Sequence, residues 1–177
     1  MTNKENGLSY IARKMYVDGL SDEQLTMDIL ESSIGGVCSK GTKLEDTRDH
    51  IDFWWTTPKG IKVSIDAKGL HRNKRHDTGF SDNHWVEVRN VLGNDGWIYG
   101  KADYISFMAE DMIMFVRPSK LIAIYEEKVM GKEVVGKIPD ETYIPYQRNG
   151  RNDVIFKMPN QHLKEISSFI TRHIQVK

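Results

Sequence analysis

Cysteine is almost absent from this sequence, because Cys38 is the single one among 177 residues. One thiol cannot build a disulfide framework or a cysteine-based zinc site. Long apolar runs are absent too, since none approaches the 18 residues typical of a membrane span. The first ten residues, MTNKENGLSY, lack the apolar stretch of a secretory signal. We therefore expect a protein of a reducing, cytoplasmic compartment without a membrane partner.

An excess of charge of one sign is also missing, since 25 Lys and Arg balance 25 Asp and Glu. Neutrality removes the simplest argument for a nucleic-acid partner. The charges are nevertheless segregated: residues 15–39 hold five acids and no Lys or Arg, whereas residues 68–76 hold four Lys or Arg, two His and no acid. The chain has no Walker, GxGxxG, GxSxG or HExxH motif and no internal repeat. A polyanion partner must therefore be argued from where the charges lie.

Hydrophobic periodicity predicts a mixed α/β protein with a packed core. Ser21 and Gln24 have the spacing of a capping box, so a helix is expected from Ser21 to the Gly35-Gly36 pair. The other expected helices cover 8–18, 118–129 and a terminal segment capped by Asn160 that carries Leu163, Ile166, Ile170 and Ile174. Strands are expected near 37–38, 50–55, 61–68, 84–88, 102–108, 112–117 and 154–156. We expect one domain over 1–177, with its core at about 21–130 and a C-terminal strand and helix at about 152–175.

The segment from His50 to Lys68 is expected to form a β-hairpin. Thr57-Pro58-Lys59-Gly60 supplies the turn, and the residue numbers of opposed positions then sum to 118. In this register one face is apolar, with Trp55 opposite Val63, Phe53 opposite Ile65 and Ile51 opposite Ala67. The other face sets Asp52 opposite Asp66 and His50 opposite Lys68.

Two opposed carboxylates repel each other unless something compensates their charge. A divalent cation is a natural compensation, since Mg²⁺ takes a few carboxylates and keeps several waters. Lys68 lies two residues from Asp66 and therefore on the same face. The alternative is a solvated hairpin face on which Asp66 and Lys68 form an ordinary surface ion pair.

Asp52 and, after thirteen intervening residues that end with Ile65, the run Asp66-Ala67-Lys68 resemble the signature of the PD-(D/E)xK nuclease superfamily. The resemblance implies a restriction-endonuclease-like α/β fold, with a mixed β-sheet core flanked by helices. It implies that Asp52, Asp66 and the Ala67 carbonyl hold Mg²⁺, with Mn²⁺ as a substitute, and that Lys68 positions water or neutralises charge. A preceding helix in that superfamily often carries a further acid, which Glu31 would match, with Asp28 as second choice. For Glu31 an exposed helix acid is an equal alternative.

The function that follows from the resemblance is Mg²⁺-dependent endonucleolytic hydrolysis of DNA, with RNA left open. The small size is similar to phage-type nucleases and to resolvases of branched DNA, which would place the protein in a host cytoplasm and allow a homodimer. The alternative is a non-catalytic nucleic-acid or protein binding module with a nuclease-like fold. The residues expected to contact nucleic acid are His50, Arg72, Lys74, Arg75, Arg148 and Arg151.

Two further expectations concern neighbouring residues. Glu87 is either a further acid of the site or, as we favour, an exposed partner of Arg89 or Lys62. The four tryptophans are expected mainly in the core, and Trp54 is the one on the site face that would stack a base.

Overall fold

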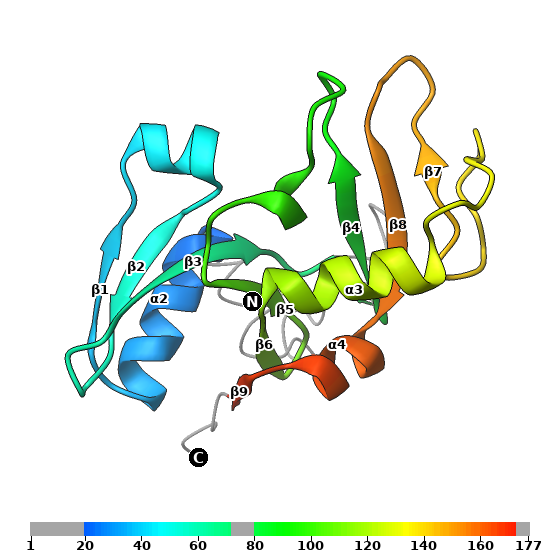
Figure 1. Cartoon of the computed structure of the whole chain (residues 1–177). Helices are drawn as coiled ribbons and strands as arrows, with labels where there is room; N and C mark the ends of the chain where they lie inside the picture. The colour runs from blue at the N-terminus through cyan, green and yellow to red at the C-terminus, as the bar shows by residue number, and fades with distance from the viewer. Residues whose placement is uncertain (1–19, 72–79, 173–177) are drawn as a thin grey trace, which may run out of the picture.

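The structure is a computed structural model that describes residues 20–71 and 80–172. The expected helix over 8–18 lies outside the described residues. The described helices are α2 (Asp22–Ser33), α3 (Pro118–Lys128) and α4 (Asn160–Ile166), with a π-helical turn η1 (Glu45–Asp49) and a 3-10 turn η2 (Trp97–Tyr99) (Figure 1). No helix in these ranges has both the length and the apolar character that a bilayer span requires.

The described strands form two sheets. The larger sheet has six strands in the order β1 (Val37–Lys40), β2 (Phe53–Thr56), β3 (Lys62–Lys68), β5 (Tyr104–Met108), β6 (Met112–Val116) and β9 (Phe169–Arg172). The smaller sheet has three strands in the order β4 (Asn83–Arg89), β8 (Val154–Pro159) and β7 (Tyr146–Gln147). β3 and β5 run parallel and every other pair is antiparallel. The protein therefore has the expected mixed α/β architecture with helices flanking a mixed sheet.

α2 begins where the sequence indicates. The Ser21 hydroxyl accepts a hydrogen bond from the Gln24 backbone N–H at 3.1 Å, which satisfies one of the free donors of the first turn. Gly35 and Gly36 both have positive φ, at 87° and 92°, so the chain turns sharply out of the helix into β1.

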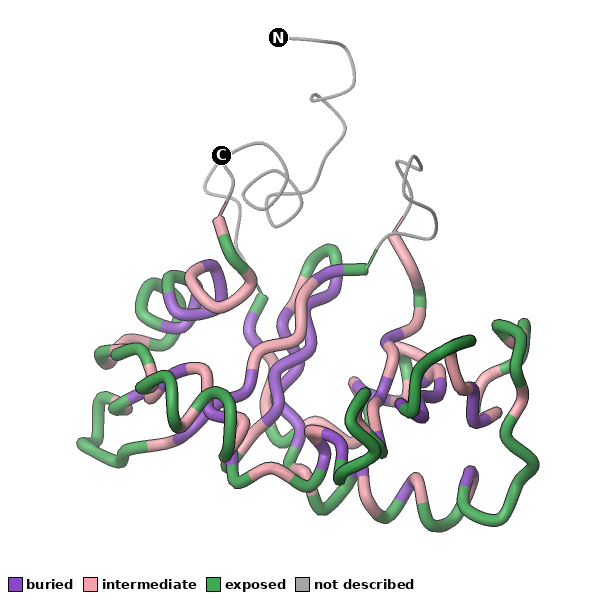
Figure 2. Tube along the Cα trace, turned by 90° about the horizontal axis from the view of Figure 1, so that it is seen from above, coloured by how far each residue is buried: buried purple, intermediate pink, exposed green. Residues whose placement is uncertain are grey.

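The large sheet has a core on each of its faces. On one face, Leu25 and Leu30 of α2 pack against Phe53 and Ile65. On the other face, strand residues including Phe107 pack against α3 and the small sheet. Figure 2 shows buried positions along the central strands and exposed positions at the turns. β4 and β8 pair with each other and belong to this second core. The strand expected near 154–156 is therefore β8, and it is built into the interior.

The predicted hairpin register is confirmed from Phe53 to Lys62, since Phe53 pairs with Ile65 and Trp55 with Val63. The strand starts later than expected, however. His50 ends η1 with a left-handed φ of 55°, so it is not part of β2. The five residues Glu45–Asp49 coil into a π turn, and the chain becomes a regular strand only at Phe53.

The expectation of a long terminal helix is wrong. α4 ends at Ile166, because Ser167 has extended backbone angles (φ −62°, ψ 138°). Ile170 lies in β9, which pairs with the edge of β6, and the Phe169 ring stacks on Phe115 with centroids 4.3 Å apart. Asn160 is the first helical residue and not the cap; its side-chain amide donates to the Ser81 carbonyl at 3.2 Å.

Candidate active site at the end of β3

Asp66 and Lys68 form an ion pair on the face of β3 that is turned away from α2. Side chains alternate along a strand, so Ile65 enters the core under α2 while Asp66 points to the opposite side, beside Ile105 of β5. The Lys68 Nζ lies 2.6 Å from Asp66 Oδ1. The Asp66 side chain is 3% exposed and that of Lys68 is 23% exposed. The alternative of a solvated surface pair is therefore wrong for Asp66.

Burial strongly perturbs the Asp66 carboxyl. Loss of solvation raises its pKa to about 7; Lys68 opposes this change and the nearby Asp52 carboxylate adds to it. The second oxygen, Oδ2, is buried and has no assigned hydrogen-bond partner among the described residues, although the Asp52 carboxyl is near enough to act on Asp66 through a hydrogen bond. A buried carboxylate oxygen without a partner is energetically costly and is available to a ligand.

Asp52 reaches the same place through an irregularity at the start of β2. Its backbone N–H donates to the Ile65 carbonyl at 2.9 Å, although Ile65 is already the register partner of Phe53. Its side-chain Oδ2 accepts from the Ala67 N–H at 2.6 Å. Asp52 is thus held beside Asp66, as the hairpin register predicted, but from a position just outside the regular strand.

A third acid at this end of β3 is Asp22, which was not among the residues predicted for the site. Asp22 is the first residue of α2, and its carboxyl lies so close to Gly69 that a Cβ added there would meet Asp22 Oδ2 at 1.9 Å. Burial raises its pKa, and the charges of Asp52 and Lys68 also act on it. The available signal was the glycine directly after Lys68, where the absent side chain leaves room for a group from another element.

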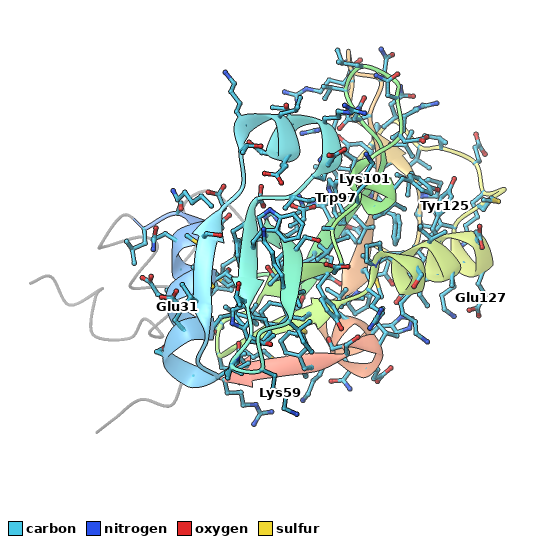
Figure 3. All side chains as sticks on the ribbon, turned by 60° about the vertical axis from the view of Figure 1, so that its left-hand side comes forward. Glu31, Lys59, Trp97, Lys101, Tyr125 and Glu127 are labelled. Atoms are coloured by element: carbon cyan, nitrogen blue, oxygen red, sulfur yellow. The ribbon has the colours of Figure 1, made fainter. Side chains whose placement is uncertain are left out.

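The structure does not bring Glu31 or Asp28 to this cluster. Glu31 lies nine residues beyond Asp22, roughly 13 Å along the helix axis, and its Oε1 accepts from the Cys38 N–H at 2.6 Å. Figure 3 shows Glu31 well apart from Trp97. Asp28 is exposed and accepts from the Gln24 side chain. The expectation that Glu31, or else Asp28, supplies the helix acid is corrected, because the first turn of α2 and not its last turns lies next to β3.

A cleft of about 430 Å³ opens beside this cluster, between the end of β3 and the small sheet. Its lining combines three aromatic side chains with charged ones. The lining includes Asp22, Lys68, Trp85, Glu87, Trp97, Ile138, Tyr146 and Arg148.

Glu87 belongs to this cleft, which corrects the favoured expectation of an exposed surface partner. Burial raises its pKa, and Lys68 is the first charge that opposes this change. The two expected partners are occupied elsewhere, since Arg89 donates to the Asn152 carbonyl and the Lys62 ammonium lies over the Trp54 ring.

Trp97 and Trp85 also line the cleft, although they were expected mainly in the core. The Lys68 ammonium lies 4.7 Å from the centroid of the Trp97 ring, and Trp85 contacts Tyr146 with centroids 5.8 Å apart. Trp54, which was expected to stack a base, donates its indole N–H to Glu45 and does not line this cleft.

The basic residues divide into three groups. Arg148 lines the cleft, and the buried Asp153 carboxylate fixes its guanidinium through an ion pair. Arg151 is exposed and lines a neighbouring open depression. Arg72, Lys74 and Arg75 lie outside the described residues.

His50 lies close enough to Lys68 and Asp52 for their charges to act on it. Burial, followed by the Lys68 charge, lowers the pKa of its imidazole. His50 is therefore near the cluster although it does not share a strand with Asp52.

The residues present suit a hard divalent cation only in part. Asp66 has a buried oxygen to which no hydrogen bond is assigned within the described part of the chain, and Asp52 is beside it. Among residues 20–71 and 80–172, no three His, Cys, Asp or Glu side chains are grouped as metal ligands. Mg²⁺ is commonly bound through one or two carboxylates with water completing its shell, so Asp52 and Asp66 fit that ion as a pair.

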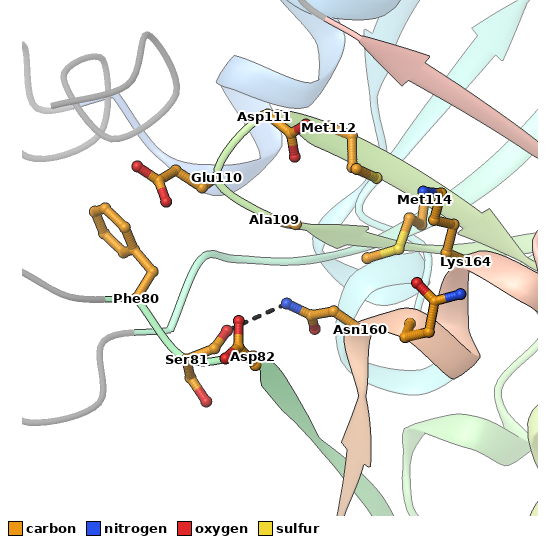
Figure 4. Close-up of a pocket in the computed structure, with 11 residues that line it drawn as sticks. Phe80, Ser81, Asp82, Ala109, Glu110, Asp111, Met112, Met114, Asn160 and Lys164 are labelled. Carbon is orange, nitrogen blue, oxygen red and sulfur yellow. Dashed lines mark hydrogen bonds between the residues drawn. The ribbon is translucent and has the colours of Figure 1, made fainter.

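A second hollow, of about 250 Å³, lies near Ser81, Asp82 and Asn160 (Figure 4). Glu110, Asp111 and Lys164 also line it. It shares no residue with the lining of the cleft beside Lys68 and includes none of the residues predicted to form the site. The cleft beside Lys68 is therefore the candidate active site.

No family model matches the chain, and no match was found among curated proteins or among solved structures.

Proposed function

We propose that this protein is a metal-dependent nuclease of the PD-(D/E)xK type, with a restriction-endonuclease-like core formed by α2, β1, β2, β3 and β5. The observation that carries the proposal is the grouping of the partly buried Asp52 and Lys68 around the buried Asp66 at the end of β3, where an exposed surface ion pair would have been the ordinary outcome. An acid from a preceding helix also belongs to that pattern, and we assign this part to Asp22 of α2, because it is near enough to Asp52 and Lys68 for their charges to act on it. The proposed setting remains the cytoplasm.

Each residue of the site has a separate proposed role. Asp52 and Asp66 would hold Mg²⁺, or Mn²⁺ in its place, with Asp22 and the Ala67 carbonyl beside them. A bound ion would supply Lewis-acid polarisation of the phosphate and lower the pKa of a water it coordinates. Lys68 would place positive charge where negative charge develops on the phosphate oxygens. The Ala67 N–H fixes the rotamer of Asp52 through its hydrogen bond. The Glu87 carboxyl is near enough to Lys68 for their opposite charges to interact.

The second candidate is a binding module that retains the fold without catalysis. One observation favours it: Lys68 and the Ala67 N–H already occupy one oxygen each of Asp66 and Asp52. The two candidates differ in what loss of Lys68 does, since a binding module loses affinity whereas a nuclease loses turnover.

The test is a cleavage assay with plasmid, single-stranded and branched DNA and with RNA, each with Mg²⁺ or Mn²⁺. Lys68→Ala and Asp66→Ala are expected to reduce the rate at least a hundredfold, in keeping with the loss of an electrostatic transition-state contact. Lys62→Ala is the matched control, because Lys62 lies on the same strand, is exposed and places its ammonium over the Trp54 ring, away from the lining of the cleft.

Two results would contradict the proposal. Wild-type protein that cuts none of these substrates would exclude a nuclease. Cleavage that falls equally in Lys62→Ala and Lys68→Ala would place the chemistry elsewhere.

A further inference from the structure

Three aromatic rings line one side of the cleft, and hydrolysis of a phosphodiester does not by itself require them. Trp85 comes from β4, Trp97 from η2 and Tyr146 from β7, so three separate elements place rings around one cavity. Aromatic side chains usually fill a core, yet Trp85 and Trp97 are only partly buried and face this opening. Ile138, on the loop before β7, adds an apolar side chain that is 64% exposed.

Of these three rings, that of Trp97 lies directly beside Lys68, and the other two line the same cleft. The Lys68 ammonium contacts both Asp66, at 2.6 Å, and the Trp97 ring, at 4.7 Å from its centroid. A phosphate at Lys68 therefore has an aromatic face next to it. Arg148, fixed by the buried Asp153, supplies a second cation to the cleft for the backbone of the same strand.

Stacking on an aromatic ring requires an exposed face of a base. In an intact duplex both faces of each base are stacked on neighbouring pairs, so a base enters a pocket only when it is unpaired or flipped out. Proteins that bind single strands combine a cationic track with aromatic rings on which bases stack. The cleft contains both components within one cavity.

We propose that the cleft lined by Trp85, Trp97 and Tyr146 binds an unpaired nucleobase of the strand whose phosphate reaches Lys68, so that the substrates are single-stranded or locally unpaired nucleic acids. This inference rests on the proposed nuclease function for the identity of the strand. It goes further by excluding an intact duplex as the preferred substrate.

The test measures binding separately from cleavage. Fluorescently labelled oligonucleotides of DNA and of RNA are titrated in EDTA and followed by anisotropy, as single strands, as blunt duplexes and as duplexes with one bulged nucleotide. Trp85→Leu is expected to weaken binding of the single strand and of the bulged duplex about tenfold, the loss of one stacked base, and to leave the blunt duplex nearly unchanged. Trp97→Leu is a second variant in case Trp85→Leu does not fold.

The matched control is Trp54→Leu, because Trp54 is also a partly buried tryptophan but lies outside the cleft. A second arm replaces the bulged nucleotide by an abasic one. The abasic site is expected to weaken binding by wild type about tenfold and to have little further effect on Trp85→Leu, since the two changes remove the same contact.

Equal losses in Trp85→Leu and Trp54→Leu, or additive effects of the variant and the abasic site, would overturn the inference. Tighter binding of the blunt duplex than of the single strand would do the same. The expected binding pattern without cleavage in Mg²⁺ would support this inference while contradicting the nuclease function, so the two failures are distinguishable.

Discussion

At the scale of single residues, the protonation of Asp66 is linked to folding. Burial raises its pKa to about 7 in the folded protein, whereas an unfolded chain would show the ordinary value of 3.8. Between these values the folded state binds a proton that the unfolded state has lost. The contribution of Asp66 to the free energy of unfolding is therefore complete below about pH 4 and is lost as the pH rises through about 7.

Asp66→Asn removes this titration, so the variant should gain stability relative to wild type as the pH rises from 4 to 8. The free energy of unfolding of the variant minus that of wild type is expected to increase by on the order of a few kcal/mol over this pH range. Urea unfolding of metal-free protein at pH 4, 6 and 8 measures it, with Asp28→Asn as a control for loss of an exposed carboxylate. A difference that stays constant across this range would show that Asp66 is ionised throughout.

At the scale of elements, the site depends on how α2 meets β3. Gly69→Ala would place a Cβ where the Asp22 carboxylate now lies, while Gly69 itself has no positive φ that an alanine would strain. The carboxylate is the end of a movable side chain, so we expect it to swing away while the fold is retained. Activity should fall roughly tenfold or more, as is common when a group beside a metal ligand is displaced.

The control for this substitution is Gly136→Ala, since a Cβ at that position meets nothing within 4 Å and the backbone angle is also ordinary. Cleavage rates and thermal melts of both variants separate an effect on the site from an effect on folding. A fully active Gly69→Ala variant would remove Asp22 from the proposed mechanism.

In the C-terminal segment, pairing with the sheet outweighs a helical spacing of apolar residues. Leu163, Ile166 and Ile170 have helical spacing, yet the structure divides them between α4 and β9. β9 covers the edge of β6 and stacks Phe169 on Phe115, a gain that local periodicity does not contain. Tertiary contacts of this kind regularly override intrinsic propensity.

At the scale of the whole molecule, one buried histidine lies between the two sheets. His84 of β4 is 1% exposed and meets the Phe107 ring of β5 edge-on, with centroids 5.2 Å apart. Burial lowers its pKa to about 3, with a smaller contribution from His71 in the same direction. Between about pH 3 and 6.5 the unfolded chain therefore binds a proton that the folded one does not, and acid weakens the packing of the sheets.

His84→Gln keeps a side-chain donor without titrating in this range. We expect the free energy of unfolding of the variant, relative to wild type, to rise as the pH falls from 7 to 4, by a few kcal/mol at most. Guanidinium titrations at both pH values provide the measurement. A difference that is independent of pH would mean that His84 has the same pKa in the folded protein as in the unfolded chain.

Several local features follow from the sequence alone: the Ser21 cap, the exit at Gly35-Gly36, and the register from Phe53 to Lys62, which brings Asp52 near Asp66. Each depends on turn chemistry or on a period of two, which neighbouring residues specify. Which acid of α2 approaches Lys68 depends on tertiary packing. The same packing brings Trp85, Glu87 and Tyr146 together in the lining of one cleft. Those residues are far apart along the chain, and their meeting depends on the packing of the small sheet and the first turn of α2 against the end of β3.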